Sequence, residues 1–275
     1  MITMQLRFAV LFFAAACGTA SASREQQATQ KQNVPALLEK LHSSDGSERA
    51  KAFVQLHSDS ANLKSPEVRS ALLDLLDREN HEFDSQLLEA QEKGHPDEGD
   101  NDNAGFVEYF GDLVGAVDSF ADWNDPRQAC ILVDANSSDE SAFTEEIADH
   151  ARVTVPCLMK RSASVISMNR AASVPVLVQA LAKAKDTLDP GTVQSASRIV
   201  LGALQDPDEL VRALTIHALA GFGAEDTIPA LRKVAEADPE PEVDGHSIRK
   251  LAADAIAAIE KRTTGQGEPQ LRPQR

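Results

Sequence analysis

The sequence predicts an all-α solenoid of antiparallel helix pairs that is irregular in its middle. First, one motif occurs twice between residues 206 and 259: Val211-Arg212 aligns with Ile248-Arg249, 37 residues later, and the apolar positions that follow align in step. This period is typical of two-helix repeats, which stack because no single repeat can bury its own apolar face. Second, only 4% of the residues are aromatic, and alanine and leucine dominate the apolar content, which favours closely packed helices over sheets.

A recurring helix start is the third observation. A capping residue, a β-branched residue and a proline occur together at Asn33-Val34-Pro35, Ser173-Val174-Pro175 and Thr227-Ile228-Pro229. Proline costs nothing in the first turn of a helix, where its missing N–H would have no partner in the helix. We expect these segments to begin the second helices of repeats, and we expect the second helices to line the curved surface of a right-handed stack.

The remaining helices are predicted from apolar residues that return every three or four positions. In addition to the repeated motif itself, the pattern predicts helices at 33–41, 48–57, 66–76, 82–93, 106–122, 127–135, 141–150, 192–204 and 248–261. The chain therefore divides into N-terminal helical repeats at 33–93, an acidic loop at 94–105, C-terminal repeats at 106–262 and a Gly- and Pro-containing tail at 263–275, which should be disordered.

The repeated stretch resembles HEAT repeats, and among them the HEAT-like repeats first associated with phycobilisome lyases. In the HEAT pattern an aspartate and an arginine six residues apart link neighbouring repeats by charge-assisted hydrogen bonds, and Asp206 and Arg212 match these positions. Arg249 matches the arginine, but Val243 stands where the aspartate is expected. We interpret Asp206, Arg212 and Arg249 as structural residues. The lyase association implies an alternative function, an enzyme that attaches or releases a tetrapyrrole (bilin).

The first 22 residues have the pattern of an export signal. Arg7 precedes an unbroken apolar run that is too short to span a bilayer, and Ala20-Ser21-Ala22 offers a cleavage site. Alternatively, the segment before Cys17 resembles a bacterial lipoprotein signal, in which the cysteine is acylated, although that pattern prefers leucine at the position of Ala14. We predict export to a bacterial periplasm or cell envelope, with either cleavage or a lipid anchor at Cys17, followed by a flexible tether at 23–32. No other stretch is apolar enough to cross a membrane.

The net charge of the chain limits the classes of partner that it can bind. A net charge of −16 argues against nucleic-acid binding, which depends on clustered Lys and Arg. In the acidic loop, Asp97, Asp100 and Asp102 partly match a calcium-binding loop, which would make the protein a calcium-responsive module. Ala104 stands where a further oxygen ligand is expected, so a solvated linker is the competing interpretation.

Four other residues each have two interpretations. Cys130 and Cys157 either form a disulfide in an oxidising envelope or remain buried thiols. Trp123, the only tryptophan, either covers a repeat junction or anchors a partner. His217 either faces a groove or is a hydrogen-bonded structural histidine.

The sequence contains no recognisable catalytic motif. It lacks a phosphate-binding glycine loop with lysine, a nucleophile elbow and a zinc-binding HExxH segment, and His81-Glu82 is a lone His-Glu pair. We therefore expect a non-enzymatic exported scaffold or adaptor that needs no cofactor or metal and binds a protein or peptide on the concave face of the solenoid.

Overall fold

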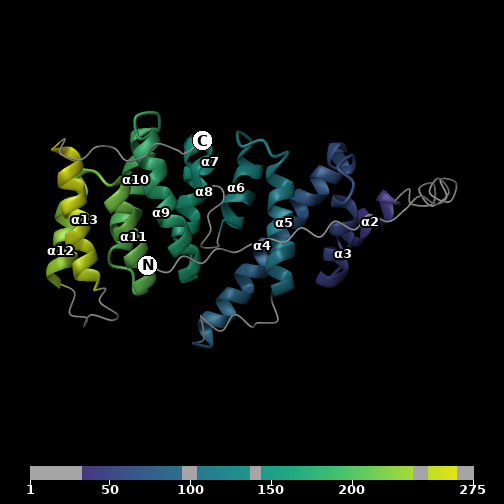
Figure 1. The fold of residues 1–275 in the computed structure, drawn as a ribbon, viewed down its shortest axis with the longest axis horizontal. Coiled ribbons are helices and arrows are strands. Elements are labelled where there is room, and N and C mark those ends of the chain that lie inside the picture. The colour runs from purple at the N-terminus through teal and green to yellow at the C-terminus, as the bar shows by residue number, and fades with distance from the viewer. Residues whose placement is uncertain (1–32, 95–103, 137–143, 238–246, 265–275) are drawn as a thin grey trace, which may run out of the picture.

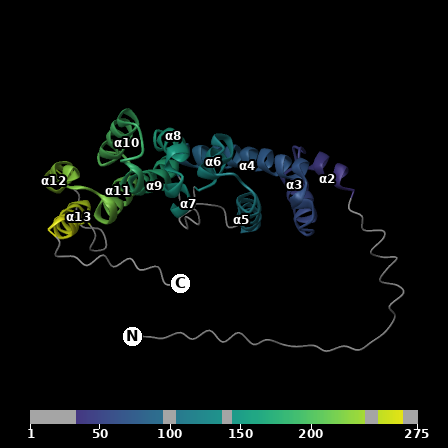
Figure 2. The same cartoon turned by 90° about the horizontal axis from the view of Figure 1, so that it is seen from above.

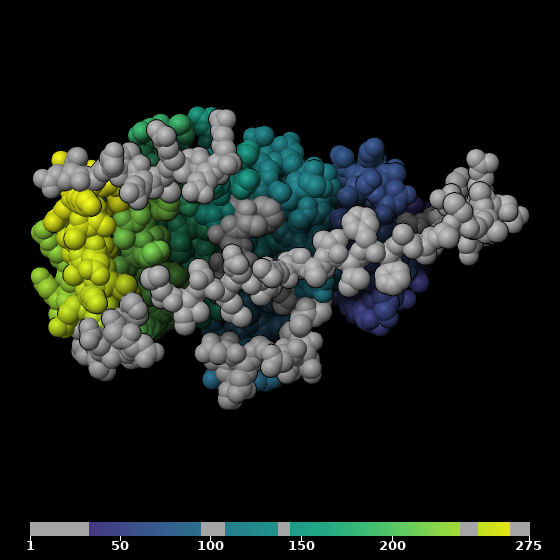
Figure 3. Space-filling model, viewed as in Figure 1, coloured from purple at the N-terminus to yellow at the C-terminus, as the bar shows by residue number. Residues whose placement is uncertain are grey.

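The computed structural model describes residues 33–94, 104–136, 144–237 and 247–264. In these ranges the chain forms twelve α-helices and two short 3-10 helices, and no strand. Figure 1 shows the helices standing side by side in one long row, and the space-filling view in Figure 3 has the same elongated outline. In chain order they are α2 (Val34–Lys40), α3 (Gly46–His57), η1 (Asn62–Lys64), α4 (Pro66–Glu92), α5 (Ala104–Asp118), α6 (Pro126–Ala135), α7 (Thr144–Asp149), α8 (Ala151–Ser162), α9 (Ser167–Ala184), α10 (Pro190–Ala203), α11 (Glu209–Phe222), η3 (Glu225–Thr227), α12 (Ile228–Ala237) and α13 (Ile248–Thr263).

The helices form two layers. Figure 2 shows α4, α6, α8, α10 and α12 along one side of the row, here the even layer, and α3, α5, α7, α9, α11 and α13 along the other, the odd layer. The buried apolar side chains between the layers belong to one cluster that extends from Leu37 to Ile259. Each helix thus buries its apolar face against adjoining helices rather than around a closed centre, and the prediction of an all-α solenoid is confirmed.

In each half of the row, neighbouring helices pack closely in only one of the two layers, and this layer differs between the halves. In the N-terminal half (α2–α8), α4 packs along α6 and α6 along α8, whereas α5 and α7 hardly touch. In the C-terminal half (α9–α13), α9 packs along α11 and α11 along α13, whereas α10 and α12 hardly touch. The long α9 joins the halves because it packs along α8, α7 and α11.

Helix starts follow local capping chemistry. The side chain of Asn33 accepts a hydrogen bond from the backbone N–H of Ala36 at the start of α2, 3.4 Å away. At the other end of the chain, Ser247 accepts from the backbone N–H of Lys250 at 3.1 Å and begins α13 as predicted. These side chains satisfy N–H groups that have no partner in the first turn. The predicted start at Thr227 is also confirmed, since α12 begins at Ile228.

Three expectations are wrong. Residues 66–76 and 82–93 do not form separate helices but one helix of 27 residues, α4. The segment Ser173–Pro175 does not begin a helix either, because α9 already begins at Ser167 and continues through Pro175. Finally, the C-terminal end of the row bends toward the odd layer, so its curved surface is lined by α9, α11 and α13, and the second helix α12 lies in the other layer (Figure 2).

Several predicted features lie outside the described residues. These are the export signal with Cys17, the tether at 23–32, the calcium candidates Asp97, Asp100 and Asp102, and the tail beyond residue 264. Within the described part of the chain, no helix combines the length and apolar character needed to span a membrane.

Candidate functional site

A groove of about 220 Å³ lies between α9 and α11, in the layer that lines the curved surface. Small residues of both helices, among them Ala172, Pro175 and Ala218, line its interior, and larger apolar side chains border it. The larger ones are Met168, Leu214 and Phe222. Phe222 is 38% exposed, although phenylalanine usually has a buried place in helical repeats. Among the residues that the structure describes, the groove therefore presents apolar surface that no other part of the chain covers.

His217 lies at this groove. It is exposed on α11 and lines the groove together with Gln179 of α9. Of the two interpretations of His217, the structure matches the one in which the imidazole faces a groove. Its two ring nitrogens offer a polar contact beside an apolar surface.

Trp123 is not available as a partner anchor. Its side chain is buried, with only 9% of the residue exposed. The indole N–H donates a hydrogen bond to Asp118, 3.2 Å from the carboxylate oxygen, and the ring stacks on His150 at 5.8 Å between centroids. The partner-binding interpretation of Trp123 is therefore wrong: the residue lies in the connection between α5 and α6, and its ring packs on His150 at the start of α8. It also does not line the groove that contains His217.

Asp206 links neighbouring repeats, as the HEAT pattern implies, through an arginine on α9. Its carboxylate accepts two hydrogen bonds from the guanidinium of Arg170 on α9, at 2.7 and 2.8 Å. Arg212 instead donates to the backbone carbonyl groups of Asp206 and Pro207, at 2.9 and 3.3 Å. Although burial opposes it, the hydrogen bonds from Arg170 hold the pKa of Asp206 below its ordinary value. Arg249 is exposed in the first turn of α13.

Arg170 and Arg212 share a contact pattern with Arg49 on α3, and we call these three the repeat arginines. Each donates from Nη1 to the carbonyl groups six and five residues before it, and Arg49 reaches Ser43 at 3.1 Å and Ser44 at 3.3 Å. These carbonyl groups belong to the turn before the helix, where the chain has no helical hydrogen bonds. The shared position thus fastens each turn to the helix that follows.

Sequence reasoning missed a buried charge cluster around Arg49. Its guanidinium donates to Glu79 of α4 at 2.7 Å, and both side chains are only 2% exposed. The hydroxyl of Tyr109 on α5 donates to the same carboxylate at 3.2 Å, and burial raises the pKa of this phenol. A signal was present, because Asp45, which caps α3, lies four residues before Arg49, and Asp208, which caps α11, lies four residues before Arg212.

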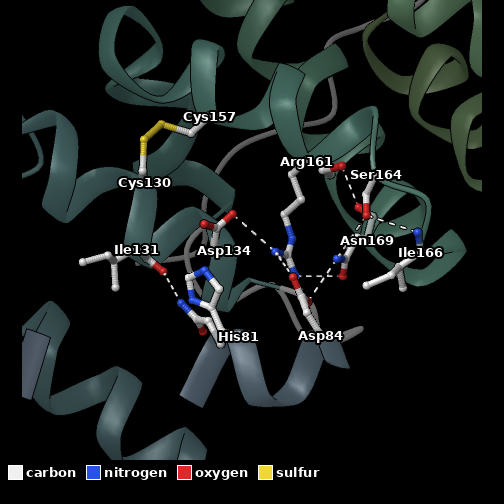
Figure 4. Close-up of polar contacts among 12 residues, drawn as sticks. His81, Asp84, Cys130, Ile131, Asp134, Cys157, Arg161, Ser164, Ile166 and Asn169 are labelled. Carbon is white, nitrogen blue, oxygen red and sulfur yellow. Dashed lines mark hydrogen bonds and ion pairs between the residues drawn. A yellow bond between two sulfur atoms is a disulfide. The ribbon is translucent and has the colours of Figure 1, made fainter. Parts of the chain in front are cut away.

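A second missed residue is Arg161, at the end of α8. Figure 4 shows its side chain between Asp134 of α6 and Asp84 of α4, with Asn169 of α9 beside it. The arginine lies three residues after Leu158 and seven after Thr154, on the buried stripe of α8, so helical periodicity alone indicated that it would be buried. Figure 4 also shows that Cys130 of α6 and Cys157 of α8 form a disulfide, with their Cα atoms 5.3 Å apart.

No metal centre was found in the part of the chain that the structure describes, where no three His, Cys, Asp or Glu side chains are placed to hold an ion. Among known proteins, residues 197–266 match the family model of HEAT repeats. Neither the curated proteins nor the solved structures gave a match. The matched residues begin within α10 and include α11, α12 and α13, next to the groove. The protein is therefore an α-solenoid, and its residues 197–266 are similar to HEAT repeats.

Proposed function

We propose that this protein is a non-enzymatic, exported scaffold that holds a segment of a partner protein in the groove between α9 and α11. The observation that carries the proposal is the open apolar groove beside Phe222, on the layer that lines the curved surface. Solenoids commonly use such extended curved faces to bind other proteins.

The chemistry of the groove favours one kind of partner segment. Its volume admits one or two large apolar side chains, and its small residues let a partner backbone come close. His217 and Gln179 supply polar contacts at its edge. We therefore propose a short segment with one or two aliphatic or aromatic anchors, which supply most of the binding free energy in such interfaces.

Two features support an exported location. Residues 1–22 have the composition of an export signal, which supports the proposal of a bacterial periplasm or cell envelope. Cys130 and Cys157 form a disulfide, and such bonds persist mainly in oxidising compartments.

The experiment that tests the proposal places a photo-crosslinking residue at His217 in the full chain, expressed in its native cell. The matched control places the same residue at Gln194, which is exposed on α10 and outside the groove. A protein captured at position 217 but not at 194 supports the proposal, and equal capture at both positions contradicts it. Because Phe222 borders the groove, Phe222→Ala should abolish capture, whereas Leu210→Ala, which also shortens an exposed apolar side chain on α11, should leave it unchanged.

The alternative function predicts a different result in the same preparation. An enzyme that handles a tetrapyrrole would retain pigment, which absorbs visible light. A purified protein that carries such an absorbance, together with no capture at position 217, would replace the scaffold proposal with the lyase-like one.

A further inference from the structure

A second cavity lies where the two halves of the solenoid meet, and it is polar. Its volume is about 210 Å³, and α4, α6, α8 and α9 all contribute to it. Figure 4 shows the central part of this polar pocket, with Arg161 reaching between the carboxylates. The lining residues are Asn80, His81, Asp84, Asp134, Lys160, Arg161, Ser164 and Asn169.

One N–H group of the Arg161 guanidinium has no hydrogen-bond partner in the described residues. Its two terminal nitrogens donate to Asp84 at 3.2 Å, Asp134 at 3.3 Å and Asn169 at 2.8 Å. Within the described part of the chain, Nε has no hydrogen-bond partner, although the side chain is only 5% exposed. A buried donor without a partner loses its hydration and gains nothing in return, so it favours a ligand that brings an acceptor.

The side chain of Asn80 has a hydrogen-bond acceptor without a partner in the described residues. Its side-chain nitrogen donates to the backbone carbonyl of Ile131 at 2.9 Å, and this contact fixes the orientation of the amide because a carbonyl can only accept. The amide oxygen Oδ1 is then an acceptor without a partner in the described residues, and the residue is only 4% exposed. Two residues that line the pocket therefore each have one buried polar atom without a partner in the described part of the chain, a donor on Arg161 and an acceptor on Asn80.

The charges of the pocket have both signs and balance. Asp84 and Asp134 carry two negative charges, and Arg161 and Lys160 carry two positive charges. Burial raises the pKa of Asp134 even though Arg161 and Lys160 oppose this shift, so the carboxylate is incompletely compensated. A further N–H donor beside it would stabilise its charged form.

We propose that the polar pocket binds a small zwitterion with an ammonium group and a carboxylate, the chemistry of a free amino acid. Its ammonium group donates to Asn80 Oδ1 and Asp134, and its carboxylate accepts from Arg161 Nε and Lys160. A simple cation satisfies only the acceptors of the pocket, and a simple anion satisfies only its donors. The volume excludes a folded partner, and about a third of each aspartate side chain is exposed, which leaves the pocket open to small molecules.

The test uses the full mature chain and isothermal titration calorimetry with each of the common free amino acids, at neutral pH. Methylammonium and acetate, each alone, serve as the two half-ligands. We expect at least one amino acid to bind with a dissociation constant below about 1 mM, and both half-ligands to bind at least about tenfold more weakly. The absence of binding by every amino acid overturns the proposal, and so does equal binding by a half-ligand.

Three variants locate the site. Asn80→Ala should weaken binding by about tenfold because it removes the free acceptor, and Lys160→Gln by about threefold because this lysine is exposed. Lys183→Gln is the matched control, because Lys183 pairs with Asp149 outside the pocket. This variant should bind the amino acid as tightly as the parent does. If circular dichroism shows that Asn80→Ala does not fold, the affinity of Lys160→Gln alone decides whether the site is assigned correctly. Unchanged affinity in Lys160→Gln and in a folded Asn80→Ala overturns the assignment. None of these variants should alter crosslinking at His217, so this proposal and the scaffold function fail independently.

Discussion

The same arginine position has different surroundings in the two halves of the solenoid. Arg49 in the N-terminal half and Arg170 in the C-terminal half hold the preceding turn through the same two carbonyl positions, and each also binds a carboxylate on a later segment. The ion pair of Arg49 and Glu79 is buried next to Tyr109, and the side chain of Arg49 is 2% exposed. Arg170 with Asp206 remains in contact with solvent, because 15% of its side chain is exposed.

The family model of HEAT repeats matches residues 197–266, so Arg49 and Arg170 both lie outside the matched residues. In the C-terminal half, alanine and aliphatic residues fill the space between helices at a regular spacing, and that spacing defines the repeat. In the N-terminal half a buried charge cluster and a helix of 27 residues replace part of that pattern. The turn-fastening arginine therefore occurs outside the matched residues, at Arg49 and Arg170, as well as within them, at Arg212.

The largest expected effect is that of Arg49→Met. This substitution leaves Glu79 buried without its cation, and such a loss costs about 3–5 kcal/mol in the free energy of unfolding. Arg170→Met should cost only about 1–3 kcal/mol, because water reaches Asp206 more easily. Urea denaturation followed by circular dichroism measures both values. Equal losses in the free energy of unfolding would show that the deeper burial of Arg49 does not increase its contribution to stability.

Removal of the disulfide should have the next largest effect. Cys130 and Cys157 are 27 residues apart, and closing a loop of this size stabilises a protein by about 3 kcal/mol. The double variant Cys130→Ser/Cys157→Ser should therefore unfold at lower urea concentration than the parent. A reducing agent should destabilise the parent by the same amount and leave the double variant unaffected. An unchanged parent under reduction would contradict the expectation.

A third prediction separates two aspartates by the sign of their pH dependence. Hydrogen bonds from Arg170 lower the pKa of Asp206 against the effect of burial, so its stabilisation is complete above the ordinary value of 3.8 and is lost as the pH falls through the lowered pKa. Burial raises the pKa of Asp134, so stability should decrease as the pH rises from 3.8 through the raised value. The free energy of unfolding is measured between pH 3 and 7 for the parent, Asp206→Asn and Asp134→Asn. A steeper acid loss in the parent than in Asp206→Asn is expected, and parallel curves for all three would contradict both assignments.

The smallest expected effect on stability is that of Phe222→Ala. Because 38% of this residue is already exposed, the loss should be roughly 1 kcal/mol or less. Leu219→Ala is the buried comparison on the same helix, where 2% exposure predicts a loss of about 2–5 kcal/mol. Thermal unfolding measures the two. A large loss in Phe222→Ala would mean that its side chain belongs to the core rather than to the groove.

Local chemistry was predictable from the sequence, and long-range polar contacts were not. The caps at Asn33 and Ser247 depend on residues within four positions, so their helices were predicted at the right places. The contact of Arg161 with Asp84 joins residues 77 positions apart, and only the packing of α6 between α4 and α8 brings them together. Sequence periodicity contains no information about which carboxylate a buried arginine will meet.

The candidate groove was predictable only in part. The sequence left two interpretations of His217, a groove residue and a structural histidine, and the packing of α9 beside α11 decides between them. The α9 side of the groove was hidden because Pro175 has the sequence context of a helix start and lies within a helix. Trp123 was misleading for a related reason, since composition gives its rarity but not its burial.

The change of the closely packed layer has a mechanical consequence. A row of helices separates first where neighbours touch least. Tension on the N-terminal half should open the space between α5 and α7, and tension on the C-terminal half should open the space between α10 and α12. These spaces lie on opposite faces of the molecule, so stretching would flex the two halves in opposite directions about α9.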